Sequence, residues 1–201
     1  MPNRPLTTKE AEAWNFAKEL HTGQIRKFIG TPYFDAHVQK VNGTVKQYTR
    51  DEDLLCAALL HDTIEDCFDD AEVGYHVIEE KFGKRVADLV MELTSSKEDM
   101  EDYDSKADYL MVKMIHMSND ALIIKLADRL QNISDAFTAS AKFRNKYFQE
   151  TIKIMDELEK NRRYNRIQAL LAGQIKGKLY NIGSIFKIKK FDEFNETLKN
   201  I

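Results

Sequence analysis

Residues 54–66 read Leu54-Leu55-Cys56-Ala57-Ala58-Leu59-Leu60-His61-Asp62-Thr63-Ile64-Glu65-Asp66. The unbroken run of leucine and small side chains at its start predicts a helix that is buried on most of its surface. Ionisable side chains at the end of a buried helix lose hydration, which costs free energy unless something binds them. If the helix continues through Asp66, then His61, Asp62, Glu65 and Asp66 all point into one sector. We interpret them as part of a metal site with an acid/base pair, rather than as a polar helix end that meets water.

The chain has 201 residues, of which 43% are apolar and 31% charged, a balance typical of a globular protein with a substantial core. We expect one domain over residues 1–160 and a C-terminal extension over residues 161–201. The net charge of -3 argues against general binding of nucleic acid, and no apolar stretch approaches the length needed to cross a membrane. The two cysteines, Cys56 and Cys67, lack CxxC spacing, and the N-terminus lacks a signal-peptide core. A reduced, cytoplasmic protein is the simplest interpretation.

Hydrophobic spacing and capping residues predict an all-α fold, because only 3 prolines and 8 glycines interrupt the chain. Thr7 and Glu10 form a capping-box pattern that opens a helix ending near Gly23. Asp35 is expected to cap the next helix, although that helix contains an Asn42-Gly43 pair, which more often marks a hairpin. Further helices are expected over residues 72–82, 86–93, 105–117, 120–137 and 141–160, with a polar loop at residues 97–104. No strand pattern is convincing before residue 175, so only the C-terminal tail leaves room for short strands.

The helix expected over residues 120–137 carries a carboxylate that its apolar stripe does not explain. Asp128, Asn132 and Asp135 share one side of this helix, at positions i, i+4 and i+7. Asp128 directly follows an apolar run that contains Lys125. From the residues alone, two interpretations stay open. Asp128 either contributes to the same metal site or forms a salt bridge with Arg129 or a neighbouring lysine.

Several motifs, in order along the chain, resemble the hydrolase domain of the RelA/SpoT superfamily, within the HD phosphohydrolase group. His21-Thr22-Gly23-Gln24-Ile25-Arg26-Lys27 is similar to the HxGQxRK of that family, and residues 61–66 are similar to its HDxxED signature. Pro32-Tyr33 followed by His37 resembles its PYxxH segment, with one residue more between the tyrosine and the histidine. Residues 82–86 and the sequence KLADRLQN at residues 125–132 complete the resemblance, which runs from about residue 10 to residue 155.

The resemblance implies an HD-domain helical bundle with one Mn²⁺ per chain, held by His37, His61, Asp62 and Asp128. Two imidazoles and two carboxylates form a mixed set of ligands that leaves coordination positions for water and a phosphate oxygen. The substrate of the family is the alarmone (p)ppGpp, hydrolysed at its 3′-diphosphate to GDP or GTP and pyrophosphate. The expected catalytic residues are Glu65 and Asp66, one acting on the attacking water and the other protonating the departing ribose oxygen. The expected contacts to the nucleotide are Arg26, Lys27, Asn132 and Tyr147.

The chain resembles the stand-alone small alarmone hydrolases, because it is too short to add the synthetase domain of the bifunctional members. Two other functions stay open. The first is an HD phosphatase of another nucleotide such as NADPH, since recognition of the base depends on loop contacts that one sequence does not define. The second is a nucleotide-sensing module without turnover, which the presence of every HDxxED residue disfavours. The expected partner is a small-molecule nucleotide, with no nucleic acid or membrane, and the oligomeric state stays open.

Overall fold

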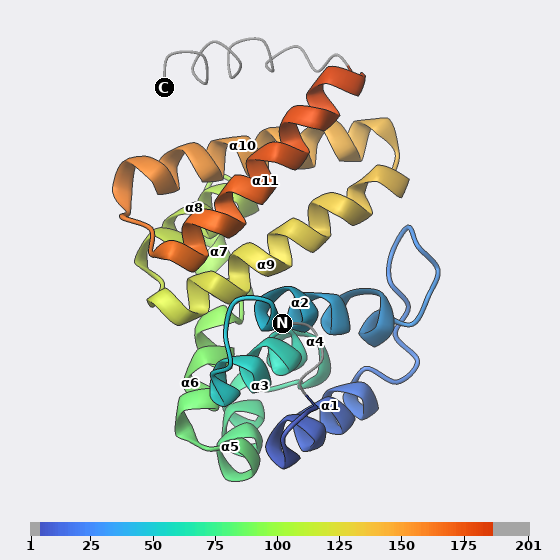
Figure 1. Ribbon diagram of the computed structural model, residues 1–201, viewed down its shortest axis with the longest axis vertical. Helices are drawn as coiled ribbons and strands as arrows, with labels where there is room; N and C mark the ends of the chain where they lie inside the picture. The colour runs from blue at the N-terminus through green and yellow to red at the C-terminus, as the bar shows by residue number, and fades with distance from the viewer. Residues whose placement is uncertain (1–4, 187–201) are drawn as a thin grey trace.

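A computed structural model describes residues 5–186, and over this range the chain is all-α, as predicted. Among these residues the only pairing of strand type is an isolated bridge between Ile25 and Pro32. A π-helix over Phe34–Val38 precedes α2, and a 3₁₀-helix over Ala136–Thr138 follows α9. The α-helices, labelled as in Figure 1, are α1 (Thr8–Leu20), α2 (Gln39–Lys46), α3 (Glu52–Leu60), α4 (Thr63–Cys67), α5 (Ala71–Phe82), α6 (Lys84–Leu93), α7 (Lys97–Glu101), α8 (Lys106–His116), α9 (Asn119–Asp135), α10 (Ala141–Asn161) and α11 (Arg166–Phe186).

Helix α3 lies at the centre of the core. Every residue from Leu54 to Leu60 is buried, and the helix packs against α1, α2, α6 and α9. Asp51 caps the N-terminus of the helix, since its side chain accepts a hydrogen bond from the N–H of Leu54. Each leucine buried in this way contributes about 1.5–3 kcal/mol of transfer free energy. The packing of α3 therefore determines where His61, the next residue, lies.

Helix α9 joins two groups of helices. It contacts α2, α3 and α6 on one side and α11 on the other, and it crosses the middle of the molecule in Figure 1. Its apolar residues from Ala121 to Leu130 are buried, and so is the carboxylate of Asp128. Because both groups pack against α9, polar residues on this helix can meet side chains from distant parts of the sequence.

Capping side chains explain where several helices begin. Thr7 and Glu10 form the predicted capping box at α1. Serine side chains cap α8 and α9, through Ser105 and Ser118. The Asn42-Gly43 pair lies within α2, as predicted, because the Asn42 amide donates to the carbonyl oxygen of Leu55 from a buried position.

The helix of the HD motif does not continue through Asp66, so that expectation was wrong. Helix α3 ends at Leu60, and α4 begins at Thr63, after a turn formed by His61 and Asp62. The hydroxyl of Thr63 donates to the carbonyl oxygen of Leu60 at 2.7 Å and satisfies an acceptor that the break would leave open. The break places His61 and Asp62 in a turn and Glu65 and Asp66 on a separate short helix.

Three further expectations need correction. Residues 97–101 form the short helix α7, because Ser96 accepts a hydrogen bond from the N–H of Asp99 and starts a turn that the polar composition concealed. Asp35 does not cap a helix; it lies inside the π-helix. The C-terminal segment contains no strand among residues 161–186. Helix α11 instead packs on α9 through an apolar face that belongs to the main core. Residues 187–201 lie outside the described range.

The π-helix over Phe34–Val38 has a direct relation to the sequence. A π-turn accommodates one more residue than an α-helical turn, and it leaves the flanking residues in register. The segment between Tyr33 and His37 is one residue longer than PYxxH. The extra residue is therefore taken up locally, while His37 and Val38 remain buried against the core.

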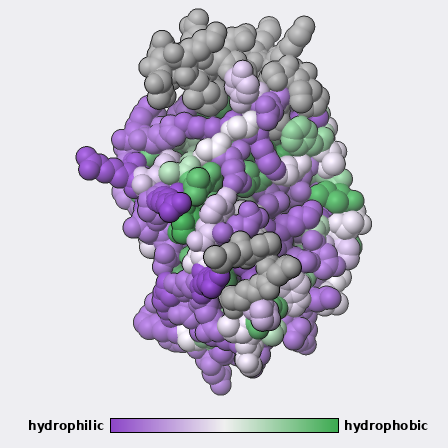
Figure 2. All heavy atoms as spheres, in the orientation of Figure 1, coloured by the Kyte–Doolittle hydropathy of each residue, from purple (hydrophilic) through white to green (hydrophobic). Residues whose placement is uncertain are grey.

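The face of the molecule in Figure 2 is mainly hydrophilic, with small separate hydrophobic patches. Among residues 5–186, no helix combines the length and the apolar character that crossing a lipid bilayer requires.

Candidate metal centre and active site

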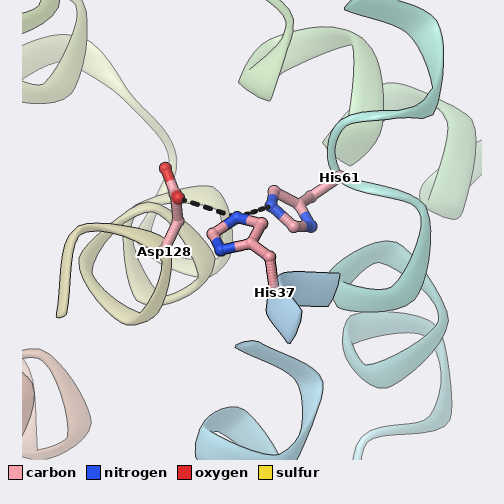
Figure 3. A group of neighbouring side chains, drawn as sticks. All are labelled: His37, His61 and Asp128. Atoms are coloured by element: carbon pink, nitrogen blue, oxygen red, sulfur yellow. Dashed lines mark hydrogen bonds and ion pairs between the residues drawn. The ribbon is translucent and has the colours of Figure 1, made fainter. Parts of the chain in front are cut away.

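Three buried side chains from separate elements meet at one point. They are His37 from the π-helix, His61 from the turn after α3 and Asp128 from α9, and their ligand atoms all lie within 4.8 Å of one another. The Nε2 atom of His37 lies 3.3 Å from the Nε2 of His61 and 3.2 Å from the Oδ1 of Asp128. Figure 3 shows His37 between the other two residues. Imidazole nitrogens and a carboxylate oxygen facing one small volume fit a divalent cation, so this cluster is a candidate metal site.

Asp62 borders the cluster. Its Oδ2 atom lies 2.9 Å from the Nε2 of His61 and 3.4 Å from the Nε2 of His37. The same oxygen accepts a hydrogen bond of 2.7 Å from the hydroxyl of Tyr33. Burial and the negative charge of Asp62 raise the pKa of Tyr33, so the tyrosine stays a neutral donor. The structure thus brings all four sequence-predicted ligands together, with Asp62 beside the group of three.

The orientation of His61 suits a metal ligand. Its Nδ1 atom lies 3.0 Å from the carbonyl oxygen of Ala58, to which it can only donate. With Nδ1 engaged by the backbone, Nε2 is the ring nitrogen that faces His37 and Asp62 and that could ligate a metal ion. A backbone acceptor of this kind is the usual outer partner of a metal-bound histidine.

Charges in the cluster change the acidity of its members. Burial alone would lower the pKa of His37, but hydrogen bonds and charge interactions with Asp128 and Asp62 outweigh burial and raise the pKa to about 9. Burial would raise the pKa of the Asp128 carboxyl, but the Lys125 ammonium and His37 hold that pKa below its usual range. The Asp62 carboxyl is likewise held well below its usual range by His61 and His37. The carboxylates of Asp62 and Asp128 therefore face the positive charge of protonated His37. A divalent cation bound at the site can take the place of that positive charge.

A cavity of about 340 Å³ opens beside the cluster and is lined by every other residue that the sequence analysis singled out for the site. These residues are Glu65 and Asp66 from α4, Arg26 and Lys27 from the loop after α1, Asn132 from α9 and Tyr147 from α10. Asp128, Asn132 and Asp135 all line it, as their shared side of the helix predicted. The cavity therefore lies between the loop after α1, the HD turn and α9.

Glu65 and Asp66 have different surroundings. A carboxylate oxygen of Glu65 accepts a hydrogen bond of 2.9 Å from the backbone N–H of Ser95, which holds the side chain against the segment after α6. Desolvation in the cavity wall, together with the Asp62 and Glu65 carboxylates, raises the pKa of Asp66 to about 6. Two neighbouring carboxyl groups in different surroundings can divide the roles of acid and base.

Arg26 is held in place by two residues of α9. Its Nε donates to the Oδ2 of Asp135 at 2.8 Å, and a terminal nitrogen donates to the side-chain oxygen of Asn132. Asn132 in turn donates to the Oδ1 of Asp128 at 2.6 Å. A continuous chain of hydrogen bonds thus runs from Arg26 through Asn132 to Asp128, a carboxylate of the candidate metal site.

Aromatic rings form the rim of the cavity on the side of α10. Phe143 and Tyr147 stack in parallel with their ring centroids 6.1 Å apart, and Phe28 packs on Phe143 at 4.8 Å. Phe28 has a φ of 70°, a left-handed backbone conformation that is costly for a bulky residue.

The salt bridge considered above for Asp128 is formed with a lysine and not with Arg129. The guanidinium of Arg129 lies over the ring of Tyr147, 5.4 Å from its centroid, and donates a hydrogen bond to the hydroxyl of Thr151. Asp128 pairs with Lys125, at 3.3 Å.

Sequence reasoning missed several residues of the cavity wall. Lys125 and Arg129 lie inside the quoted KLADRLQN motif, and Lys125 stands one helical turn before Asp128, so its spacing was a usable signal. Tyr33 was present in the PYxxH segment. By contrast, Ser95 and Lys106 lie in polar segments around α7, and nothing local in the sequence distinguishes them from surface residues.

Comparisons with known proteins agree with this arrangement. A model of the HD domain family matches residues 13–163. The chain is 35% identical over 130 residues to a guanosine-3′,5′-bis(diphosphate) 3′-pyrophosphohydrolase of Xenopus tropicalis, and this alignment covers 62% of this chain and 67% of that protein. It is 34% identical over 143 residues to an Aquifex aeolicus protein of the same name, and this second alignment covers 71% of this chain. The solved structure of a metazoan orthologue of SpoT that hydrolyses ppGpp matches with a TM-score of 0.69 and 26% identity, over 88% of this chain and 98% of that one.

The relatives differ in length. The chain spans 20% of the Aquifex aeolicus protein and 25% of a related Mycoplasma pneumoniae protein, whereas it covers nearly all of the solved metazoan structure. The matched region contains every cluster and cavity residue described above. The chain belongs to the HD domain family and is homologous to the guanosine-3′,5′-bis(diphosphate) 3′-pyrophosphohydrolases.

Proposed function

We propose that this protein is a phosphohydrolase that uses one Mn²⁺ to hydrolyse the 3′-diphosphate of (p)ppGpp to GDP or GTP and pyrophosphate. The observation that carries the proposal is the meeting of His37, His61 and Asp128, with Asp62 beside them, at the wall of a cavity large enough for a nucleotide. The homology to pyrophosphohydrolases supplies the substrate class. A cluster of two imidazoles with carboxylates suits Mn²⁺, whose preferred ligands are oxygen and imidazole nitrogen.

In this proposal, His37, His61, Asp62 and Asp128 hold the metal. A divalent ion bound there would polarise a phosphate oxygen and make a water molecule more acidic. Water attacks the phosphorus atom bonded to the 3′-oxygen, so a new P–O bond forms, and the bond between phosphorus and the 3′-oxygen breaks. One of Glu65 and Asp66 takes the proton of the water, and the other gives a proton to the departing 3′-oxygen.

Asp66 suits the acid in this pair, because its raised pKa keeps part of the population protonated near neutral pH. Glu65 suits the base. Its hydrogen bond from the backbone N–H of Ser95 fixes the position of the carboxylate.

The nucleotide end of the substrate would lie toward Arg26, Lys27, Asn132 and Tyr147. Arg26 and Asn132 are already oriented by the hydrogen bonds that link them to α9, so little side-chain freedom is lost on binding. Tyr147 presents its ring beside Phe143, which suits stacking against a base or ribose.

The test is a panel of nucleotides incubated with the manganese-loaded protein, with products separated by chromatography. The panel contains ppGpp, pppGpp, ppApp and NADPH. We expect release of pyrophosphate from ppGpp and pppGpp, and no release by an Asp128→Ala variant. Release of orthophosphate from NADPH without turnover of the alarmones would assign a different phosphatase activity to the same site. Tight binding of ppGpp without any product would identify a nucleotide sensor.

A further inference from the structure

The charged residues of the cavity are engaged to different degrees. Arg26 is paired with Asp135, Lys125 with Asp128, and Arg129 with Thr151 and the ring of Tyr147. Lys106 also lines the cavity but is held much more loosely. Its ammonium nitrogen lies 3.9 Å from the Oε1 of Glu65, too far for a hydrogen bond, and 62% of its side chain is exposed to solvent. Lys106 can therefore turn its charge toward a bound anion at little cost.

Helix α9 provides an axis along which the cavity residues can be ordered. Lys125, Asp128, Asn132 and Asp135 follow one another along the helix and all line the cavity. Ten residues of α-helix span about 15 Å, so the wall from Lys125 to Asp135 is about as long as a nucleotide with phosphates on both sides of its ribose. The metal cluster at Asp128 lies between the two ends of this wall.

The two ends of the cavity differ in chemistry. At the Asp135 end lie Arg26 and the loop that carries Lys27 and Phe28, next to the aromatic rim on α10. At the other end Glu65 lies beside Lys106, and its negative charge also acts on Lys125. Aromatic rings suit a nucleoside, and exposed ammonium groups suit phosphate.

From these observations we propose that Lys106 binds the terminal phosphate of the 3′-diphosphate and selects a diphosphate over a monophosphate. The inference rests on the proposed function and adds a specificity-determining residue to it. The phosphate that undergoes attack would lie beside the cluster of His37, His61 and Asp128, and the second phosphate would extend away from the ribose, past Glu65, to Lys106. A substrate with a single phosphate at this position would end at the cluster and gain nothing from Lys106.

The experiment uses the full chain loaded with manganese and three variants. Lys106→Gln removes the charge and keeps a polar side chain that is one atom shorter, while Lys106→Arg keeps a charge. The matched control is Lys160→Gln, an exposed lysine of α10 that pairs with Glu157 and does not line the cavity. Two quantities are measured for each protein: the KM and kcat for ppGpp, and the binding of pyrophosphate and of orthophosphate by calorimetry.

We expect Lys106→Gln to raise the KM for ppGpp and the Kd for pyrophosphate by roughly tenfold, with the Kd for orthophosphate unchanged, since one charge-assisted phosphate contact is lost. Lys106→Arg should restore most of the affinity, and Lys160→Gln should behave as wild type.

If the wild-type protein hydrolyses ppGpp but the Kd for pyrophosphate is the same in Lys106→Gln, the inference is wrong and the proposed function stands. If the wild-type protein does not hydrolyse ppGpp, the proposed function fails, and the calorimetric comparison still decides whether Lys106 recognises a second phosphate. A fall in kcat alone, with a shifted pH profile, would mean that Lys106 acts through Glu65, and this result also overturns the inference.

Discussion

The Nε atom of Arg26 donates to the Oδ2 of Asp135 at 2.8 Å, and this ion pair ties the loop after α1 to the last turn of α9. Both side chains are mostly buried, so the pair is not an ordinary surface salt bridge. Arg26 was expected to be a cation available to an anionic substrate, but two of its five N–H donors are already used within the protein. The pair positions the loop and leaves the remaining donors of the guanidinium for a ligand.

This arrangement predicts the effects of two substitutions on substrate affinity. Arg26→Ala should raise the KM for ppGpp by roughly tenfold or more, because it removes a positioned charge and releases the loop. Asp135→Asn keeps the shape of the partner and removes the opposing charge, so its KM should stay the same or fall. Steady-state kinetics measure both effects, and metal content should be unchanged in both variants. A wild-type KM in Arg26→Ala would mean that the substrate does not reach this loop.

The second prediction concerns the stoichiometry of the metal. Purified protein should hold about one manganese ion per chain, and Asp62→Ala and Asp128→Ala should each lose most of it, because removal of one ligand weakens a site with few protein ligands. Elemental analysis after gel filtration measures the content. Asp135→Asn is the matched control, since Asp135 lines the same cavity but stands outside the cluster. Unchanged metal in both Ala variants would disprove the ligand set.

The third prediction separates catalysis from binding. Glu65→Gln and Asp66→Asn preserve shape and remove only the charge and the exchangeable proton. Each should lower kcat by roughly two to four orders of magnitude, while the affinity for metal and substrate changes only a few-fold. Single-turnover kinetics together with metal analysis distinguish the two effects. A variant that turns over at the wild-type rate would show that its carboxylate has a structural role only.

The fourth prediction follows from the raised pKa of His37. In the metal-free protein, this pKa is about 9, against an ordinary value of 6.5. The folded state therefore binds an extra proton between these two values, so this contribution to stability is complete below pH 6.5 and is lost as the pH rises through about 9. A metal ion must displace that proton, so manganese affinity should rise over the same range.

Thermal unfolding at several pH values checks both parts of this prediction. The Tm of the metal-free protein should fall between pH 6.5 and pH 8.5, while the increase in Tm caused by added manganese should grow. Calorimetry in buffers of different ionisation enthalpy should detect proton release on binding. An increase in Tm that does not vary with pH would contradict the assignment of a protonated His37.

The fifth prediction tests the π-helix. Deleting the exposed Asp35 should convert the π-turn to an ordinary α-helical turn and leave His37 on the same face, so that the protein folds and still binds about one manganese ion. The matched control is deletion of the exposed Lys40, which lies in the regular helix α2. That deletion should rotate His37 by about 100° relative to the buried face of α2 and abolish metal binding. Loss of metal in the Asp35 deletion would show that the extra residue has a role of its own.

Much of the fold follows from local patterns. The apolar run from Leu54 to Leu60, the capping box at Thr7 and the serine caps each depend on neighbours within one or two helical turns, so they could be predicted from the sequence. The break between α3 and α4 could not be predicted in the same way. It follows from the cost of continuing a buried helix into His61 and Asp62, whose side chains find partners in Tyr33 and His37 from a different segment.

The sequence by itself determined the all-α class, the types of residue in the candidate metal cluster and the shared side of Asp128, Asn132 and Asp135, because helical periodicity and motif spacing are properties of adjacent residues. Only the tertiary structure decided that Arg26 meets Asp135, 109 residues away, and that Ser95 and Lys106 reach Glu65. Such pairs depend on how whole helices pack around α9. That packing is set by the sum of many apolar contacts, and no local pattern in the chain contains this information.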